Sequence, residues 1–410
     1  MKRTLFFLLI GSAMSVSLAS AQQAPLKGYT TVIPLHKPPA DTSSAALQSL
    51  VVGVTPLPMW TYSITASADL GGGVYTGQIM GHSPYLRGKG VTTLPTQIIP
   101  LVITITDTNG TFTYDPTATD TGCVAGHTVV DVITSSPIYT NNSWTMNGVN
   151  VGTTQYEDAN VRAEFWSLVN GSNYHLLLSE TTLASQALSF GTGGANGPGT
   201  NYPTSTFGLC DPIGVININD LDSAVQALIT GPLAGTVNVG TFPIFLTKNV
   251  VSATSGTSIF SSCCVLGYHS AFSVPPHIQV YSPFAIDTAG AFGPGFTSAF
   301  SHEIGEAIHD PSTNNPTPVW GNIGQDVGNC TATPPGQNNF EDGDPLSPGF
   351  GTPTNEWSVL GSNSLTYDLQ ELAFYNWFYG GPSLGAGGGY SNHGTFKGDA
   401  ILCSAGGGTH

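Results

Sequence analysis

Hydrophobic residues recur along the chain first with the two-residue period of strands and later with the 3.6-residue period of helices. From Trp60 onward the first third is rich in β-branched residues, and Asp107–Gly110 has the composition of a hairpin turn. This part is therefore predicted to be mostly antiparallel β-structure. We expect strands at 61–66, 74–80, 97–106, 111–114, 214–218, 242–251 and 277–286. We expect helices at 156–169, 219–230, between Thr297 and Pro311, and at 365–379.

The sharpest helical pattern is the one between Thr297 and Pro311. At about 100° per residue, the residues divide into a polar face and an apolar face. Thr297 or Ser298 is suited to cap the start, and Pro311 ends the helix because the residue before a proline is displaced from the α region. The polar face carries His302, Glu306 and His309, and the apolar face carries Phe300, Ile304, Ala307 and Ile308.

The polar face contains a metal-binding pattern. The run from His302 to Glu306 reads H-E-x-x-E, a variant of H-E-x-x-H, in which two ligands one helical turn apart bind one Zn²⁺. In that motif the glutamate after the first histidine acts as general base. We therefore expect His302 and Glu306 to bind a metal and Glu303 to activate a metal-bound water.

The third ligand must come from elsewhere in the chain. Asp326 lies 20 residues after Glu306, a separation typical of the glutamate that completes sites of the thermolysin kind. His309 shares the polar face, but its Cα is expected roughly 10 Å along the helix axis from that of His302, and Asp310 lies further still. Asp326 is the preferred third ligand, and His309 and Asp310 remain candidates for the metal or for contacts behind its ligands.

A ligand set of one histidine and two carboxylates suits Zn²⁺, and it suits other divalent cations such as Mn²⁺ or Ca²⁺ about as well. The acidic turn Glu341–Asp344 is a separate candidate for Ca²⁺. Tyr268 and His269 are candidates to stabilise the oxyanion of a transition state. The alternative to a metal site is a solvated helix face that binds no ion.

The N-terminal segment predicts export. Lys2 and Arg3 precede the apolar run Leu5–Leu18, and Ala19-Ser20-Ala21 has the small residues of a cleavage site, so residues 1–21 are a predicted signal peptide. We expect residues 22–59 to be an N-terminal arm or pro-segment and residues 60–410 to form one domain. No later apolar run reaches the roughly 20 residues of a membrane span. The expected location is therefore extracellular or periplasmic.

The chain carries little charge, and most of it is negative. Charged residues are 8% of the total, with 9 Lys and Arg against 25 Asp and Glu and a formal net charge of −16. Nucleic acid and anionic membrane surfaces are therefore not expected as partners. The six cysteines predict disulfides in an exported chain, and we expect the neighbours Cys263 and Cys264 to pair with distant partners. The sequence does not indicate an oligomeric state.

Three segments between Cys263 and Cys330 resemble the secreted exordium, or phosphate-induced protein, group and its bacterial relatives. Those chains carry a cysteine-rich stretch with Gly-Tyr-His, then a strand, an H-E-L-A-E helix and an E-I-G-D-x-C segment. The matching segments here are 263–269, 302–306 and 326–330. The last one is a residue shorter and has Asp326 where the family has Glu, which leaves the third ligand open. The resemblance implies a secreted protein with an H-E-x-x-E helix, and the plant members are growth-related extracellular proteins.

The expected fold is α+β and zincin-like, with a mixed, mostly antiparallel sheet behind the H-E-x-x-E helix and a loop-rich C-terminal part. Two functions fit this pattern. The first is a secreted metal-dependent hydrolase, most simply a zinc metalloendopeptidase that acts on proteins or peptides with Glu303 as general base. The alternative is a non-catalytic extracellular binding or cell-surface protein of the exordium type, in which the helix is structural.

Overall fold

The computed structural model describes residues 44–86, 90–261, 263–292, 297–320, 337–346 and 356–398. The predicted signal peptide lies outside these residues. The described chain combines sheets with a smaller number of helices, so the α+β class is confirmed.

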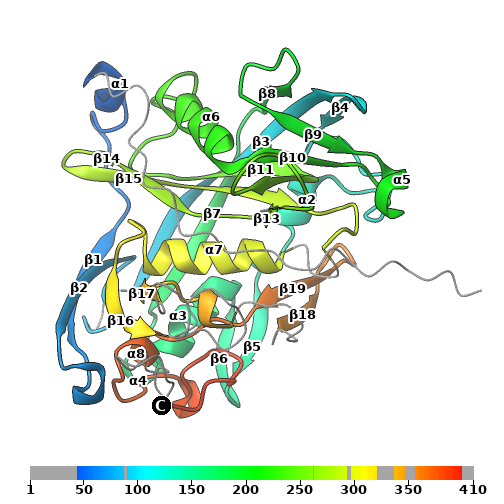
Figure 1. The fold of residues 1–410 in the computed structure, drawn as a ribbon. Coiled ribbons are helices and arrows are strands. Elements are labelled where there is room, and N and C mark those ends of the chain that lie inside the picture. The colour runs from blue at the N-terminus through cyan, green and yellow to red at the C-terminus, as the bar shows by residue number, and fades with distance from the viewer. Residues whose placement is uncertain are drawn as a thin grey trace, which may run out of the picture.

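A seven-stranded mixed sheet forms the centre of the molecule (Figure 1). Its longest strand, β3 (Val91–Asp107), pairs in parallel with β7, β8 and β11, and it pairs antiparallel with β4. On the far side of β11, β15 runs parallel to it and β14 runs antiparallel to β15. The remaining strands are β4 (Gly110–Tyr114), β7 (His175–Thr182), β8 (Gln186–Gly191), β11 (Phe242–Lys248), β14 (Ser270–Val274) and β15 (His277–Ile286).

The prediction of a mostly antiparallel sheet is wrong for this central sheet. Its antiparallel pairs are the hairpin β3–β4, which the turn after Asp107 predicts, and the hairpin β14–β15. The chain then passes through helices and a hairpin before β7, and through β9, α5, β10 and α6 before β11. Such long crossovers return the chain to the starting end of a sheet, so the next strand runs parallel.

Antiparallel pairing prevails in the smaller sheets. A four-stranded sheet has the order β13-β12-β10-β9, and four two-stranded hairpins lie outside it. The predicted strand 242–251 is divided between β11 and β12 because Asn249 takes a φ of 54°, which asparagine tolerates better than most residues. The strands are β9 (Gly199–Tyr202), β10 (Ile213–Asn217), β12 (Val250–Ala253) and β13 (Cys263–Val265), with hairpins β1 (Met59–Thr65) and β2 (Val74–Met80), β5 (Asn142–Met146) and β6 (Val149–Thr154), β16 (Pro316–Trp320) and β17 (Gln337–Asn339), and β18 (Glu356–Leu360) and β19 (Thr366–Gln370).

The helices follow the predicted periodicity in part. The helix expected at 156–169 is broken at Phe165 into α3 and α4. The helix expected at 219–230 is α6, and its cap is Asn217, whose side chain accepts the N–H of Asn219. The described α-helices are α1 (Ser44–Ser49), α2 (Val129–Thr134), α3 (Tyr156–Glu164), α4 (Trp166–Val169), α5 (Thr204–Phe207), α6 (Ile218–Thr230), α7 (Ser298–His309) and α8 (Tyr375–Phe378).

The helix predicted at 365–379 is wrong. Thr366–Gln370 forms strand β19, which pairs with β18, and only Tyr375–Phe378 is helical. A short run of aromatic and aliphatic residues does not distinguish a buried strand from a buried helix. The pairing partner, which the sequence does not indicate, decides the outcome here.

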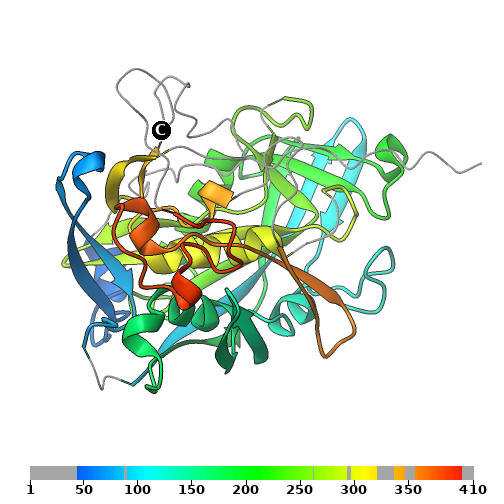
Figure 2. The same cartoon turned by 90° about the horizontal axis from the view of Figure 1, so that it is seen from below.

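Helix α7 lies between the central sheet and the C-terminal elements (Figure 1). The ring of Phe300 packs on that of Phe284 in β15, with centroids 4.6 Å apart, so the sheet backs the motif helix as expected. The helix ends at His309, before Pro311. Thr297 occupies the N-cap position, but its hydroxyl donates to the carbonyl oxygen of Asp368. On the face away from the sheet, the segment 356–398 crosses over α7 (Figure 2).

The described part of the predicted N-terminal arm packs on the rest of the molecule. Leu50 and Leu57 are buried in the core. The backbone N–H of Leu57 donates to the carbonyl of Val239 at 2.8 Å. Residues 50–57 therefore belong to the folded body.

Two disulfides join described cysteines. Cys123 and Cys210 are bridged across 87 residues, which confirms the expectation of disulfides. Cys263 and Cys264 are bridged to each other, so the prediction of distant partners for this pair is wrong. Their peptide bond is cis, and their Cα atoms are 3.0 Å apart.

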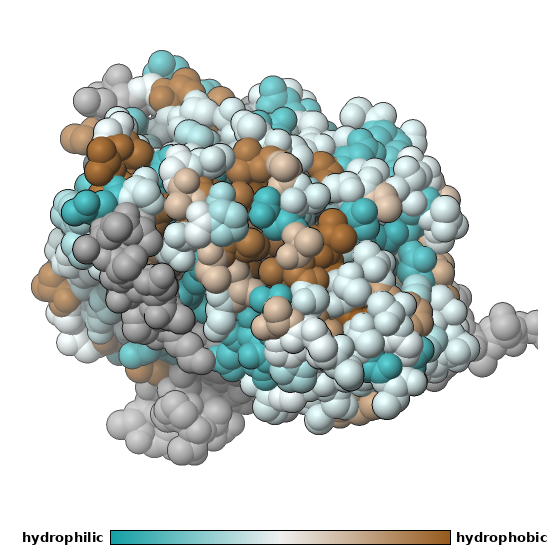
Figure 3. Space-filling view, turned by 90° about the horizontal axis from the view of Figure 1, so that it is seen from above, coloured by the Kyte–Doolittle hydropathy of each residue, from teal (hydrophilic) through white to brown (hydrophobic). Residues whose placement is uncertain are grey.

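Within the described ranges, no helix has both the length and the apolar character required to cross a membrane. Seen from above, the surface is a mixture of hydrophilic residues and separate hydrophobic patches (Figure 3). Exposed side chains such as Val52 and Leu360 contribute to the apolar part of the surface.

The apolar face of α7 anchors the helix that presents the polar face, so we expect it to contribute much of the free energy of unfolding in this region. Ile304 is fully buried, so Ile304→Ala should lower the free energy of unfolding by about 2–5 kcal/mol. Leu360→Ala, at a site that is 70% exposed, should change it by less than about 0.5 kcal/mol. Urea unfolding followed by circular dichroism measures both, and equal effects would show that α7 is not anchored through this face.

Candidate metal centre

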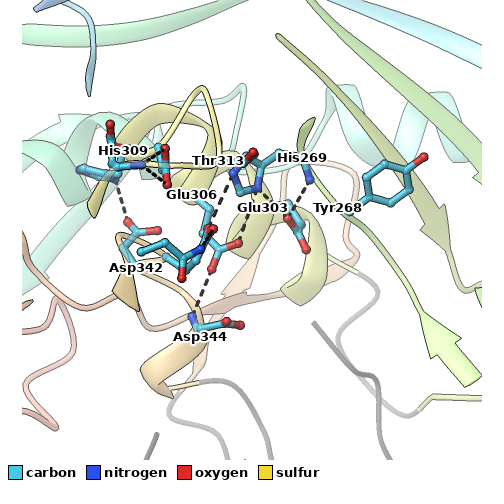
Figure 4. A network of polar contacts seen from close by, with 12 residues as sticks. Tyr268, His269, Glu303, Glu306, His309, Thr313, Asp342 and Asp344 are labelled. Atoms are coloured by element: carbon cyan, nitrogen blue, oxygen red, sulfur yellow. Dashed lines mark hydrogen bonds and ion pairs between the residues drawn. The ribbon is translucent and has the colours of Figure 1, made fainter. Parts of the chain in front are cut away.

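The polar face of α7 lies against the acidic turn Glu341–Asp344 and the residue His269 (Figure 4). Three side chains come from α7, two from the acidic turn and one from the segment between β13 and β14. None of the six residues is more than 5% exposed. We call this set the histidine–carboxylate cluster: His269, His302, Glu303, Glu306, Glu341 and Asp344.

His302 presents one ring nitrogen to carboxylates. Its Nε2 lies 3.0 Å from Oε1 of Glu306, 3.7 Å from Oδ1 of Asp344 and 4.0 Å from Oε1 of Glu303. Its Nδ1 lies 3.0 Å from Oε1 of Gln370. An amide oxygen only accepts, so Nδ1 carries the proton, and in the neutral ring the Nε2 lone pair faces the carboxylates. A metal-binding histidine is typically held in this way through its second nitrogen.

Gln370, at the end of β19, fixes this arrangement. Its Nε2 donates to the carbonyl of Gly343 at 2.6 Å, which settles the orientation of its amide, and its backbone N–H donates to Oγ of Ser301. A Cβ on Gly343 would lie 2.4 Å from Nδ1 of His302, so the acidic turn approaches the histidine this closely because residue 343 has no side chain. The helix, the turn and β19 are thus held together at the cluster.

His269 completes the cluster from the opposite side. Its backbone N–H and its Nδ1 lie 3.0 and 3.1 Å from the same atom, Oε2 of Glu303. Its Nε2 faces Oε2 of Glu341 at 3.7 Å. Among the described residues, neither of these last two atoms has a hydrogen bond. The sequence placed His269 near the reacting groups, and the structure brings it into direct contact with Glu303.

Tyr268, predicted together with His269 to stabilise an oxyanion, points away from the cluster (Figure 4). Its hydroxyl donates to Oδ1 of Asp222 at 3.3 Å. Adjacent residues of an extended segment project to opposite sides. The structure therefore brings His269 to the site and removes Tyr268 from it.

His309 belongs to a neighbouring ion cluster and not to the candidate metal site. Its Nε2 lies 2.9 Å from Oε2 of Glu164 on α3, and its Nδ1 lies 2.8 Å from Oδ2 of Asp342. Asp310 accepts the backbone N–H groups of Asn314 and Asn315. Both residues lie behind the cluster, because His309 is seven residues, or about two helical turns, from His302 along α7.

Asp326, the expected third ligand, lies outside the described residues. Among the described residues, the acidic turn supplies the further carboxylates of the cluster: Asp344 lies beside His302, and Glu341 lies beside His269. The turn was predicted as a separate Ca²⁺ site, but its three carboxylates face three different histidines. The acidic turn is recognisable in the sequence, but no sequence pattern indicates that it packs against α7. No pattern indicates that Gln370 accepts a hydrogen bond from His302.

The spacing of these groups fits a cation. Two sets of three residues offer one ligand atom each within 4.8 Å of one another, namely His302, Glu303 and Glu306, and His269, Glu306 and Glu341. Ligands bound to one ion at about 2.1 Å stand roughly 3–4 Å apart, depending on the angle between them. The distances of 3.0–4.0 Å around Nε2 of His302 lie in this range.

Burial makes this charge distribution costly without a counter-ion. Burial, reinforced by the carboxylates of Asp344 and Glu303, holds the pKa of Glu306 well above its usual value. Burial and the carboxylate of Glu306 do the same for the pKa of Glu341. The ion pairs that these two glutamates and Glu303 make with described residues are all with histidines. A bound divalent cation would offset the repulsion that raises these pKa values.

No family model, no curated protein and no solved structure matches this chain. The chemistry of the cluster is therefore the basis for a functional assignment.

The metal-free protein should lose stability as the pH rises above about 6.5. Burial alone would lower the pKa of His269, but Glu341 and Glu303 outweigh it and raise that pKa to about 9. The stabilisation from the protonated ring is complete below the unfolded pKa of about 6.5 and is lost as the pH approaches 9. The raised pKa values of Glu306 and Glu341 act in the same direction, because the folded state holds these protons more tightly than the unfolded state.

Urea unfolding in the presence of a chelator, at steps between pH 6 and pH 9, measures this loss, which we expect to be roughly 2–3 kcal/mol for His269 alone. His269→Gln should give a flatter profile. Stability of the wild type that rises over this range would contradict the assigned charges.

Proposed function

We propose that the chain is a secreted metal-dependent hydrolase that binds a divalent cation through His302, Glu306 and Asp344 and cleaves peptide bonds with Glu303 as general base. The observation that supports it is the position of Nε2 of His302, which faces three carboxylate oxygens while Nδ1 is held by an amide oxygen. Zn²⁺ is the expected cation, and Mn²⁺ would suit the same ligands. Asp344 is the ligand that the described residues offer here, and Asp326 remains a prediction.

Glu303 has two differently engaged oxygens, which suits it to proton transfer. Oε2 is held by the backbone N–H and Nδ1 of His269, and Oε1 faces Nε2 of His302 at 4.0 Å. A cation in this position would supply Lewis acidity and lower the pKa of a water molecule. Oε1 of Glu303 would take the proton of the attacking water and return it to the leaving amine. His269 is a positioning residue in this scheme, because it fixes the rotamer of Glu303.

Glu303→Gln should separate proton transfer from metal binding. The amide keeps the shape of the side chain but cannot accept the proton, so casein cleavage should fall by at least about 100-fold while the bound metal is retained. The purified full chain is assayed for metal by mass spectrometry and for cleavage at neutral pH. Glu180→Gln, at an exposed site on β7, is the matched control and should retain both. Wild-type activity in Glu303→Gln would remove the proposed role of Glu303.

Burial of the cluster favours a second candidate, a non-catalytic extracellular protein in which the cation is structural. The six residues are at most 5% exposed, and such burial is usual for ions that join elements of a fold. In this case the cation links α7 to the acidic turn. The resemblance to the exordium group is consistent with such a protein.

The structural candidate predicts that metal removal changes stability and nothing else. A cation present at 1,000 times its dissociation constant stabilises the fold by about 4 kcal/mol, so chelation or His302→Ala should lower the thermal midpoint. His277→Ala, on the β14–β15 hairpin, serves as the control and should leave the midpoint nearly unchanged. Peptide cleavage that disappears with chelator and returns with Zn²⁺ would exclude this candidate.

A further inference from the structure

The two carboxylate oxygens of Glu306 face different histidines. Oε1 lies 3.0 Å from Nε2 of His302 and accepts the backbone N–H of Asp344 at 3.2 Å. Oε2 lies on the other side, 3.7 Å from Nδ1 of His269. A carboxylate that offers one oxygen to each of two neighbouring sites can bridge two cations, as in two-metal hydrolases, whose ions lie about 3.5–4 Å apart.

The side that Oε2 faces has the donors for a second ion. Glu303 accepts from Nδ1 of His269, so the neutral ring directs the Nε2 lone pair toward Oε2 of Glu341. These two atoms are buried, and among the described residues neither has a hydrogen bond. When the ring is neutral, as a metal ligand must be, the nitrogen and the carboxylate oxygen both present lone pairs, and a shared cation gives each of them a bond.

The formal charge of the cluster decides between one ion and two. With both histidines neutral, as metal ligands must be, and all four carboxylates ionised, the buried cluster of Glu303, Glu306, Glu341 and Asp344 carries four negative charges. One divalent cation leaves two of these charges uncompensated, and two divalent cations neutralise all four. A buried net charge is costly in a protein interior, so the second cation is the electrostatically favoured state.

We propose that the cluster binds two divalent cations bridged by Glu306. The first is held by His302, Glu306 and Asp344, as in the proposed function on which this inference rests. The second is held by Nε2 of His269, Oε2 of Glu306 and Oε2 of Glu341. Imidazole together with carboxylates suits Zn²⁺, Mn²⁺ or Fe²⁺ at both positions.

Metal stoichiometry tests the proposal on the full chain. The protein is stripped of metal, reloaded with Mn²⁺, desalted and analysed for metal per chain, and its electron paramagnetic resonance spectrum is recorded. We expect two equivalents and the broadened signal of a spin-coupled pair. Glu341→Gln, which keeps the size of the side chain, should bind one equivalent and give the six-line signal of an isolated ion. Glu180→Gln should behave as the wild type.

The outcomes separate this inference from the proposed function. One equivalent in the wild type, lost in His302→Ala, overturns the second site and leaves the first. Two uncoupled equivalents that persist in Glu341→Gln also overturn it, because the second ion then lies elsewhere. No bound metal removes both proposals. The wild-type spectrum decides the question even where a variant fails to fold.

Discussion

The contact between the polar face of α7 and the acidic turn Glu341–Asp344 is the interaction on which the site depends. Carboxylates rarely lie this deep in a protein unless they are paired or bind a cation. Here the carboxylates of two separate chain segments meet two imidazoles with no more than 5% exposure. The geometry that allows it is specific, since Gly343 has no side chain where the ring of His302 passes.

The scaffold around this contact is apolar on one side and hydrogen-bonded on the other. Phe300 and Ile304 anchor α7 toward the sheet through Phe284. On the opposite side, β19 contributes Gln370, and α3 contributes Glu164, which holds His309. His309 in turn binds Asp342, the middle carboxylate of the acidic turn. The turn is therefore connected to α7 at two levels, His302 and His309, which are about two helical turns apart.

The same features explain why the cluster is suited to cations and not to a simple ion-pair network. Each histidine has one nitrogen held by an acceptor, the amide of Gln370 or the carboxylate of Glu303, and directs the other toward carboxylates. Two protonated rings compensate only two of the four carboxylates, so without cations the other two must hold protons, in agreement with the raised pKa values of Glu306 and Glu341. Cations supply the missing positive charge without altering these contacts. Whether the ion then serves chemistry or only joins the helix to the turn depends on the access of a substrate to a site that is this deeply buried.

Local periodicity was sufficient to predict α7 from the sequence. The positions of His302 and Glu306 on one face, the apolar face of Ile304, and the end before Pro311 all depend on the 3.6-residue repeat and on proline sterics. The helical rise made His309 a less favoured ligand, and its contacts with Glu164 and Asp342 place it outside the cluster. The β3–β4 hairpin was likewise determined by its turn residues.

Tertiary structure alone decided which residues meet the polar face of α7. The acidic turn and Gln370 come from segments that lie 35–68 residues after Glu306 or His302. His269 comes from the connection between two strands before the helix. No local sequence pattern relates these residues to the helix. The parallel pairing of the central sheet and the strand at Thr366–Gln370 were missed for the same reason, since a partner far along the chain selects them. Sequence periodicity specifies the face that a helix presents, whereas packing between distant segments specifies the groups that this face contacts.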